Sequence, residues 1–207
     1  MSVAEALERR RSIKHFDASR AMSDEELRAL LSPMRLVPTS FNLQHGRFVA
    51  VRDPKKREEL SAAAFGQPQV KDCSCVVLIV ADVNAHESAE ALWAGAPQTV
   101  IEGMSQMIRD FYGGKPTLQR DESIRSGSLA AMALMLLAAE QGWDSCPLIG
   151  FDPHKVRDVI AVPDGYICVL MIAIGHATQP AYPRVGRLDL GELARLETFD
   201  GASLSEE

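Results

Sequence analysis

Apolar and polar residues alternate along the chain in patterns that predict helices and strands in turn. Apolar residues recur at helical spacing, and Ser-x-x-Glu and Asp-Pro pairs mark helix starts at Ser23, Asp53 and Asp152. Gly142 ends the longest apolar helix. The predicted helices cover residues 2–10, from Ser23 towards Arg35, 54–64, 98–112, 123–141 and a short segment from Pro153.

Three segments have the pattern of strands. Residues 47–52 follow a polar loop, and the run CVVLIVA over 75–81 is a continuous β-branched stretch, typical of a strand covered on both faces. A turn at 163–165 leads into the strand 166–174. Because the strands are separated by unequal helical segments, we expect an α+β fold and not a regular βαβ series.

The helix over residues 123–141 is apolar on nearly every side, so we expect it either at the centre of a core or shared with a partner subunit. Its apolar run, 129–139, is eleven residues, short of the ~20 that cross a bilayer. The charged start MSVAEALERRRS does not resemble a signal peptide. We therefore expect a cytoplasmic protein with no membrane partner, and a single domain over residues 1–207.

Charge and motif content exclude several classes. The net charge of −6 argues against nucleic acid as a partner. The four cysteines and five histidines show neither Cys-x-x-Cys nor His-Glu-x-x-His spacing, so we expect no metal site. A dinucleotide-binding Gly-x-Gly-x-x-Gly after a strand and a phosphate-binding Walker loop are also lacking. A small anionic ligand held by a local basic cluster remains compatible with this composition.

Residues 9–14, RRRSIK, form such a cluster. Cations at a helix C-terminus are favoured by the helix dipole, which would explain the cluster without a ligand. Alternatively, guanidinium groups match phosphate oxygens and the Ser12 hydroxyl adds a donor, which predicts a phosphate clamp. Arg184 and Arg187, in the proline-rich tail, could complete such a clamp.

Two further segments carry candidate chemistry. The loop PTSFNLQ, residues 38–44, mixes hydroxyl and amide side chains, which suit the edge of a planar heterocycle or, alternatively, satisfy the loop's own backbone. In GWDSCPLIGFDP, residues 142–153, Gly150 allows a ligand to approach the backbone closely. The alternative there is an ordinary connection between two helices.

Taken together and in this order, these segments resemble the FMN-dependent nitroreductase family, and especially its small bacterial NAD(P)H nitroreductases. The resemblance rests on RRSIKHF, PTSFNLQ, GWDSCPLIGFD, AIGH and PRVGR, and it extends from about residue 4 to 190. It implies a central, mostly antiparallel or mixed sheet flanked by helices. It also implies a homodimer that exchanges a C-terminal arm, residues 177–207, and a variable, substrate-side helical region over 86–120.

The resemblance implies an FMN site at the subunit interface, with Lys14 near the N1/O2 edge of the flavin and backbone of residues 149–150 at N5. Catalysis would need no acid–base side chain. The implied cofactor residues are Arg10, Arg11, Ser12, Lys14, Gln69, Pro147, Leu148, Ile149, Gly150, Arg184 and Arg187, with Pro38, Thr39, Ser40, Asn42 and Gln44 from the opposite subunit. The implied acceptor-pocket residues are Phe41, Phe111 and Tyr112.

The chain departs from the family pattern within its loop, where Phe41 replaces a small residue and Gly46 replaces a tryptophan. The implied activity is hydride transfer from NAD(P)H through flavin N5 to quinones or nitroaromatic compounds, by a ping-pong mechanism. Three alternatives remain open. They are a non-catalytic flavin-binding or sensing protein, a specialised flavin-consuming or dehalogenating relative, and a helical interaction domain without a ligand.

Overall fold

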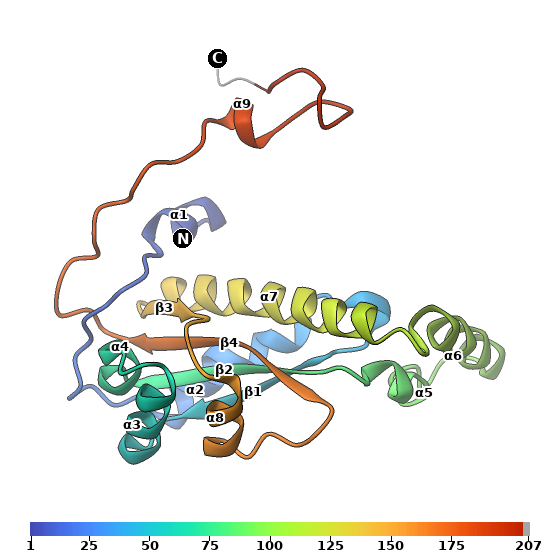
Figure 1. Ribbon diagram of the computed structural model, residues 1–207, viewed down its shortest axis with the longest axis horizontal. Coiled ribbons are helices and arrows are strands. Elements are labelled where there is room, and N and C mark those ends of the chain that lie inside the picture. The colour runs from blue at the N-terminus through green and yellow to red at the C-terminus, as the bar shows by residue number, and fades with distance from the viewer. Residues whose placement is uncertain (205–207) are drawn as a thin grey trace.

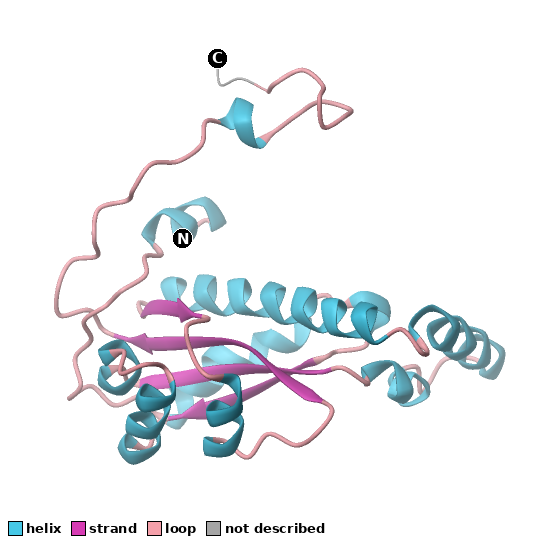
Figure 2. Ribbon diagram, viewed as in Figure 1, coloured by secondary structure: helices cyan, strands magenta, loops and turns pink. Residues whose placement is uncertain are grey.

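The computed structural model describes residues 1–204, and a four-stranded sheet lies at its centre (Figures 1 and 2). The strands are β1 (Gly46–Val51), β2 (Cys75–Asp82), β3 (Asp144–Leu148) and β4 (Tyr166–Gly175), in the spatial order β1-β2-β4-β3. Each neighbouring pair is antiparallel. With helices on both faces, this confirms the expected α+β fold.

Strand β2 separates two hydrophobic cores. Val76 and Leu78 point into one core, and Val77 and Ile79 point into the other. All four side chains are fully buried. Since successive side chains of a strand face opposite sides of the sheet, a strand that is apolar throughout must be covered on both faces, as its sequence predicted.

Three short helices cover the first face of the sheet: α3 (Pro54–Ala63), α4 (Pro68–Asp72) and α8 (Pro153–Val159). Each begins with proline, whose missing N–H would have no helical partner there. Asp53 and Asp152 cap α3 and α8 by accepting backbone N–H groups of the first turn.

The second face is covered by α7 (Pro116–Glu140), α2 (Asp24–Leu31) and the 3₁₀ helix η1 (Ser32–Leu36). Figure 1 shows α7 running the length of the sheet. By length and composition α7 could cross a membrane, but half of its most apolar stretch is buried inside the fold. The core helix of a globular protein meets the same criterion, and α7 packs on β2 and β4 in this way.

Truncation of Leu134 tests the contribution of α7 to stability. Its side chain is fully buried against the sheet, so Leu134→Ala should lower the free energy of unfolding by about 3 kcal/mol, through lost burial and the cavity left behind. Urea unfolding followed by circular dichroism measures this change. Met107→Ala, at a position on the opposite end of the molecule that is 52% exposed, is the matched control and should change stability by about 0.5 kcal/mol or less. Equal losses in both variants would contradict the assigned core position.

A helical lobe extends beyond one end of the sheet. It comprises η3 (Ala85–Ser88), α5 (Ala89–Leu92) and α6 (Gln98–Tyr112), at the right of Figure 1. The lobe and the loop before β1 share a small core of their own, separate from the two cores on the sheet. Its buried members are Leu43, Ala85, Ala89, Ile108 and Tyr112.

The N-terminal helix α1 (Val3–Arg9) and a C-terminal arm lie at the other end (Figure 1). From residue 177 the arm runs away from the sheet in extended form, with one short helix, α9 (Leu190–Leu193). Exposed apolar side chains follow its length, and Phe199 is 99% exposed. The arm was expected over 177–207, of which 205–207 lie outside the described residues; its exchange between subunits stays a prediction.

The structure also differs from the sequence-based elements. Residues 144–148 form strand β3, where a loop was expected, because an edge strand tolerates Pro147 in spite of its missing N–H. Helix α7 begins at Pro116, whereas the sequence predicted a start near residue 123. The prediction missed the first two turns because they are polar and carry no apolar periodicity. Short helix α4 was not predicted either.

Candidate functional site

A basic cavity of about 240 Å³ lies between the N-terminal segment and the start of the C-terminal arm. It brings together six of the predicted cofactor residues from the two ends of the chain. It is lined by Arg10, Arg11, Ser12, Lys14, Tyr182, Pro183, Arg184, Val185 and Arg187. Four arginines and a lysine line it, and no carboxylate does.

Local structure places residues 10–14 beside the sheet. Ser2 and Glu5 form a capping box that begins α1, and the helix ends at Arg9. The chain then runs along the edge of β3, where the N–H of Ile13 donates to the carbonyl of Ser145 at 3.0 Å. The buried Ile13 side chain anchors this segment in the core, so that Ser12 and Lys14 on either side face the cavity.

Arg184 ties the arm to the end of α1. Its Nη2 donates to the carbonyl of Glu8 at 2.7 Å, and Arg11 donates to the carbonyl of Tyr182. Desolvation lowers the pKa of Arg184, and the positive charges of Arg11, Arg187 and Arg10 add to this effect. The cavity therefore gathers like charges that an anion would neutralise.

Arg10 supplies a second sign that an anion belongs here. Its Nε is buried and has no hydrogen-bond partner among residues 1–204. A buried donor without an acceptor costs free energy, because its hydration is lost without replacement. A phosphate group would provide acceptors for this donor and for the neighbouring guanidinium groups.

Lys14 lines the cavity and is held there by a residue that the sequence did not single out. Its Nζ lies 3.5 Å from Sγ of Cys146 on β3, and this thiol is fully buried. Burial raises the pKa of Cys146, and the Lys14 charge only partly opposes this. The neutral thiol thus orients the ammonium group without neutralising its charge.

The Ile149–Gly150 turn follows β3 and presents backbone to solvent. Ile149 is 77% exposed, and neither its N–H nor that of Gly150 donates a hydrogen bond within residues 1–204. Gln67 Nε2 donates to the Gly150 carbonyl at 2.8 Å, and the buried Gln69 donates to Gln67 in turn. Gln67 was missed by sequence reasoning, although its position two residues before Gln69 in GQPQ was a usable signal. Leu148 packs into the core, so only its backbone can serve a site.

The loop before β1 adopts a strained conformation. Phe41, Asn42 and Gln44 have φ values of 49°, 56° and 49°, in the left-handed region that favours glycine. The Gln44 N–H donates to Oγ1 of Thr39 at 2.9 Å. The loop thus satisfies part of its own backbone, while the side chains of Asn42 and Gln44 remain exposed. Pro38 lines a separate, apolar groove.

The three predicted acceptor-pocket residues form one aromatic cluster. The ring centroid of Phe41 lies 5.8 Å from that of Phe111 and 6.2 Å from that of Tyr112, in edge-to-face arrangements. Phe111 is 46% exposed, whereas Tyr112 is 2% exposed and its ring contacts both of the others. Their role towards an acceptor stays a prediction, in which Phe41 and Phe111 supply the accessible surface.

Within one chain, the basic cavity and the loop lie far apart. Ser12 forms a β-bridge with Ser145 of β3, and both Ser145 and Cys75, the first residue of β2, pair with Ile174 of β4. The basic cavity therefore lies at the start of β2. The loop lies near the end of β2, because Gly46, which follows the loop, pairs with Ala81. Six residues of strand separate the two levels by about 20 Å. Strands β1 and β3 also form opposite edges of the sheet. A single chain therefore does not bring the predicted cofactor residues together.

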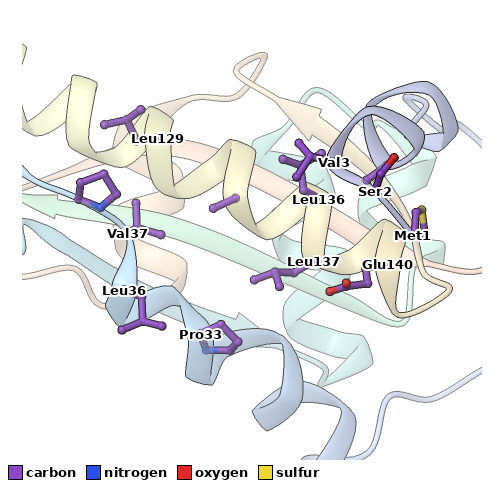
Figure 3. Close-up of a pocket in the computed structure, with 13 residues that line it drawn as sticks. Met1, Ser2, Val3, Pro33, Leu36, Val37, Leu129, Leu136, Leu137 and Glu140 are labelled. Carbon is purple, nitrogen blue, oxygen red and sulfur yellow. The ribbon is translucent and has the colours of Figure 1, made fainter.

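An apolar groove of about 480 Å³ runs along the outer face of α7 (Figure 3). Leu129 and Leu137 of α7 face Leu36 of η1 across it, with Met1 and Val3 at one end. Leu129 is 52% and Leu36 is 79% exposed. Large exposed apolar patches of this kind usually mark an interaction surface.

Buried His45 lies beneath the loop and is the basis of a pH prediction. It is 3% exposed, and its Nδ1 has no hydrogen-bond partner among the described residues. Burial lowers the pKa of His45; Glu122 and Asp82 oppose this, whereas His86 and Arg47 add to it. The neutral imidazole is therefore the form that the folded chain favours.

A folded-state pKa below the unfolded value of about 6.5 means that the unfolded chain binds the proton more readily. The stability contributed by neutral His45 is thus present above about pH 6.5 and is lost as pH falls through the lowered folded pKa. Urea unfolding between pH 8 and pH 5 should show a steeper acid loss for the wild type than for His45→Gln. His154→Gln, at an exposed position, should retain the wild-type slope. Parallel curves for the wild type and His45→Gln would contradict this assignment.

Comparisons with known proteins agree on one family. A sequence model of the nitroreductase family matches residues 7–176. Protein DrgA of Synechocystis sp. is 42% identical over 93% of this chain and 95% of its own. A candidate NAD(P)H nitroreductase of Bacillus subtilis, MhqN, is 36% identical over 88% of this chain and 93% of its own.

A solved structure agrees with the sequence matches. A candidate nitroreductase of Exiguobacterium sibiricum, determined in complex with FMN, superposes with a TM-score of 0.87. It is 27% identical and covers 95% of this chain and 98% of its own. The structural similarity thus extends over nearly the whole chain.

Proposed function

The chain belongs to the nitroreductase family, and on this premise we propose that it is an FMN-dependent oxidoreductase that uses NADH or NADPH to reduce a quinone or a nitroaromatic compound. Curated relatives carry NAD(P)H nitroreductase names, and one solved relative contains FMN. The observation in this chain that carries the proposal is the basic cavity, in which a buried arginine donor lacks an acceptor.

The residues of the cavity fit the FMN phosphate. Arg10 and Arg11 would donate to its oxygens together with the Ser12 hydroxyl, and Arg184 and Arg187 would close over it from the arm. A phosphate is smaller than the volume of about 240 Å³, which leaves space for the adjoining part of the ribityl chain. The proposed anchor is therefore electrostatic, and it should weaken as salt concentration rises.

Lys14 and the exposed turn after β3 would hold the flavin ring. A fixed cation beside the N1/O2 edge favours the more negative, reduced cofactor, and Cys146 orients that cation. The N–H groups of Ile149 and Gly150 would face N5, and Gln67 fixes their turn through the Gly150 carbonyl. Bound FMN supplies the redox chemistry, taking a hydride from the nicotinamide and passing reducing equivalents to the acceptor.

A homodimer completes the site in this proposal. Because the loop residues lie about 20 Å from the cavity in their own chain, they would serve the cavity of the second chain. The apolar groove along α7 and the exposed apolar side chains of the arm supply surface for this contact. Thr39, Ser40, Asn42 and Gln44 would then reach the flavin from the partner subunit.

The two substrates would bind in turn at the same exposed face of the ring, which corresponds to a ping-pong mechanism. Phe41 and Phe111 would flank this face and offer apolar surface to a flat acceptor. Since the nucleotide donor is an intracellular metabolite, we place the enzyme in the cytoplasm.

The visible spectrum of the purified protein tests the proposal first, because bound FMN absorbs visible light. Oxidation of NADH and of NADPH with menadione or a nitroaromatic acceptor is then measured under anaerobic conditions. Steady turnover supports the proposal. A colourless protein that does not shift the spectrum of added FMN overturns it. Bound FMN without turnover favours a flavin sensor, and consumption or dehalogenation without quinone reduction favours a specialised relative.

A further inference from the structure

One hydrogen bond joins the helical lobe to the proposed cofactor loop. The Tyr112 hydroxyl at the end of α6 donates to Oγ of Ser40 at 2.7 Å, although the two residues are 72 positions apart. Tyr112 is 2% exposed, and the same small core encloses its ring and the side chain of Leu43 in the loop. The contact is therefore fixed from both sides by packing.

The direction of this bond follows from the acidity of the two hydroxyl groups. A phenol, with a pKa of about 10, is far more acidic than an aliphatic alcohol, so Tyr112 donates and Ser40 accepts. Burial raises the pKa of Tyr112, which keeps the phenol protonated at neutral pH. Because Oγ of Ser40 already accepts from Tyr112, its own proton is left to be donated elsewhere, and donation in series strengthens that second bond.

The backbone that follows Ser40 depends on the same tyrosine. Phe41 and Asn42 hold left-handed φ values, a conformation that is unfavourable for a bulky residue such as Phe41. The edge-to-face contacts of Phe41 with Tyr112 and Phe111 offset part of this cost. Tyr112 thus contacts the turn at two points, through its hydroxyl and through its ring.

We propose that Tyr112 is a positioning residue of the cofactor site, which fixes the Ser40 hydroxyl as a hydrogen-bond donor towards FMN. The inference rests on the proposed function, since it takes Ser40 to contact the flavin. A donor stabilises the more negative, reduced cofactor more than the oxidised one. The helical lobe, in addition to facing the acceptor, then tunes how readily the bound cofactor is reduced.

Tyr112→Phe tests this role because it removes one oxygen and keeps the ring. In the FMN-loaded protein, the affinity for reduced FMN should fall three- to tenfold relative to the affinity for oxidised FMN. This change lowers the midpoint potential by about 15–30 mV for a two-electron couple. In the FMN-free protein, amide hydrogen exchange at residues 42–44 should be faster by about threefold or more, since their N–H bonds lie within the turn. Tyr166→Phe, at the start of β4 and outside the site, is the matched control and should change neither.

A double-mutant cycle separates positioning from general loosening of the lobe. Ser40→Ala should lower the potential at least as much as Tyr112→Phe, and the double variant should shift it no further than Ser40→Ala alone, because both residues act through one donor. An unchanged potential in Tyr112→Phe, or additive shifts in the double variant, would overturn the inference while FMN binding by the wild type still stands. A wild-type protein that retains no FMN would instead remove the proposed function and this inference with it.

Discussion

Replacing Arg10 by alanine should weaken FMN binding by about 10- to 100-fold, because a hydrogen bond to a charged group contributes about 1.5–3 kcal/mol. Arg10 lines the basic cavity, and its buried Nε has no other partner among residues 1–204. The dissociation constant is measured by quenching of FMN fluorescence, at several salt concentrations. The loss should be largest at low salt, where the phosphate contact is least screened.

Arg9→Ala is the matched control for this prediction. Arg9 is the neighbouring cation in the last turn of α1, but it is exposed and does not line the cavity. The Arg9→Ala substitution removes the same charge from the same segment, so the FMN affinity of this variant should differ from that of the wild type by less than about threefold. Equal affinities of Arg10→Ala and the wild type would show that the cavity does not hold the phosphate through Arg10.

Leu129→Arg should produce a folded monomer that has lost FMN almost completely. Leu129 is 52% exposed on α7 and lines the apolar groove, so a charged side chain there would be buried without a partner in a dimer. Such burial costs several kcal/mol, which is enough to dissociate a micromolar or weaker contact. Light scattering gives the mass, and circular dichroism reports whether the fold is retained.

Met107→Arg provides the control, because Met107 is equally exposed at 52% but lies on α6, away from the groove. It should leave the mass and the FMN content unchanged. A Leu129→Arg monomer that holds FMN as tightly as the wild type would refute the shared site. A Leu129→Arg dimer would show that the groove is not the contact surface.

The sequence predicted those elements whose own residues determine their structure. The run CVVLIVA at residues 75–81 was identified as a doubly covered strand, because only burial on both faces explains seven apolar residues in succession. Strand β3 was not predicted because Asp144, Ser145 and Pro147 have low strand propensity. Its position is decided by pairing with β4. Tertiary context therefore outweighed local preference at this edge.

The site divides in the same way. Side-chain chemistry alone suggested that the arginines at both ends of the chain could form one clamp, and the structure brings them to one cavity. Its supporting contacts could not be read from spacing. Tyr112 meets Ser40 across 72 residues, and Cys146 meets Lys14 across 132. Such partners are chosen by how the elements pack, and neither residue type signals its partner in the sequence.

The wide separation of basic cavity and loop within one chain has a genetic consequence. If each FMN site takes its cavity from one subunit and its loop from the other, a variant damaged at Arg10 and a variant damaged at Asn42 are both defective as homodimers. In a mixed dimer, however, both defects fall in one site, and the other site is wild type throughout. Two inactive proteins, dissociated and reassociated together, should then regain up to one intact site per mixed dimer, so that each mutation complements the other.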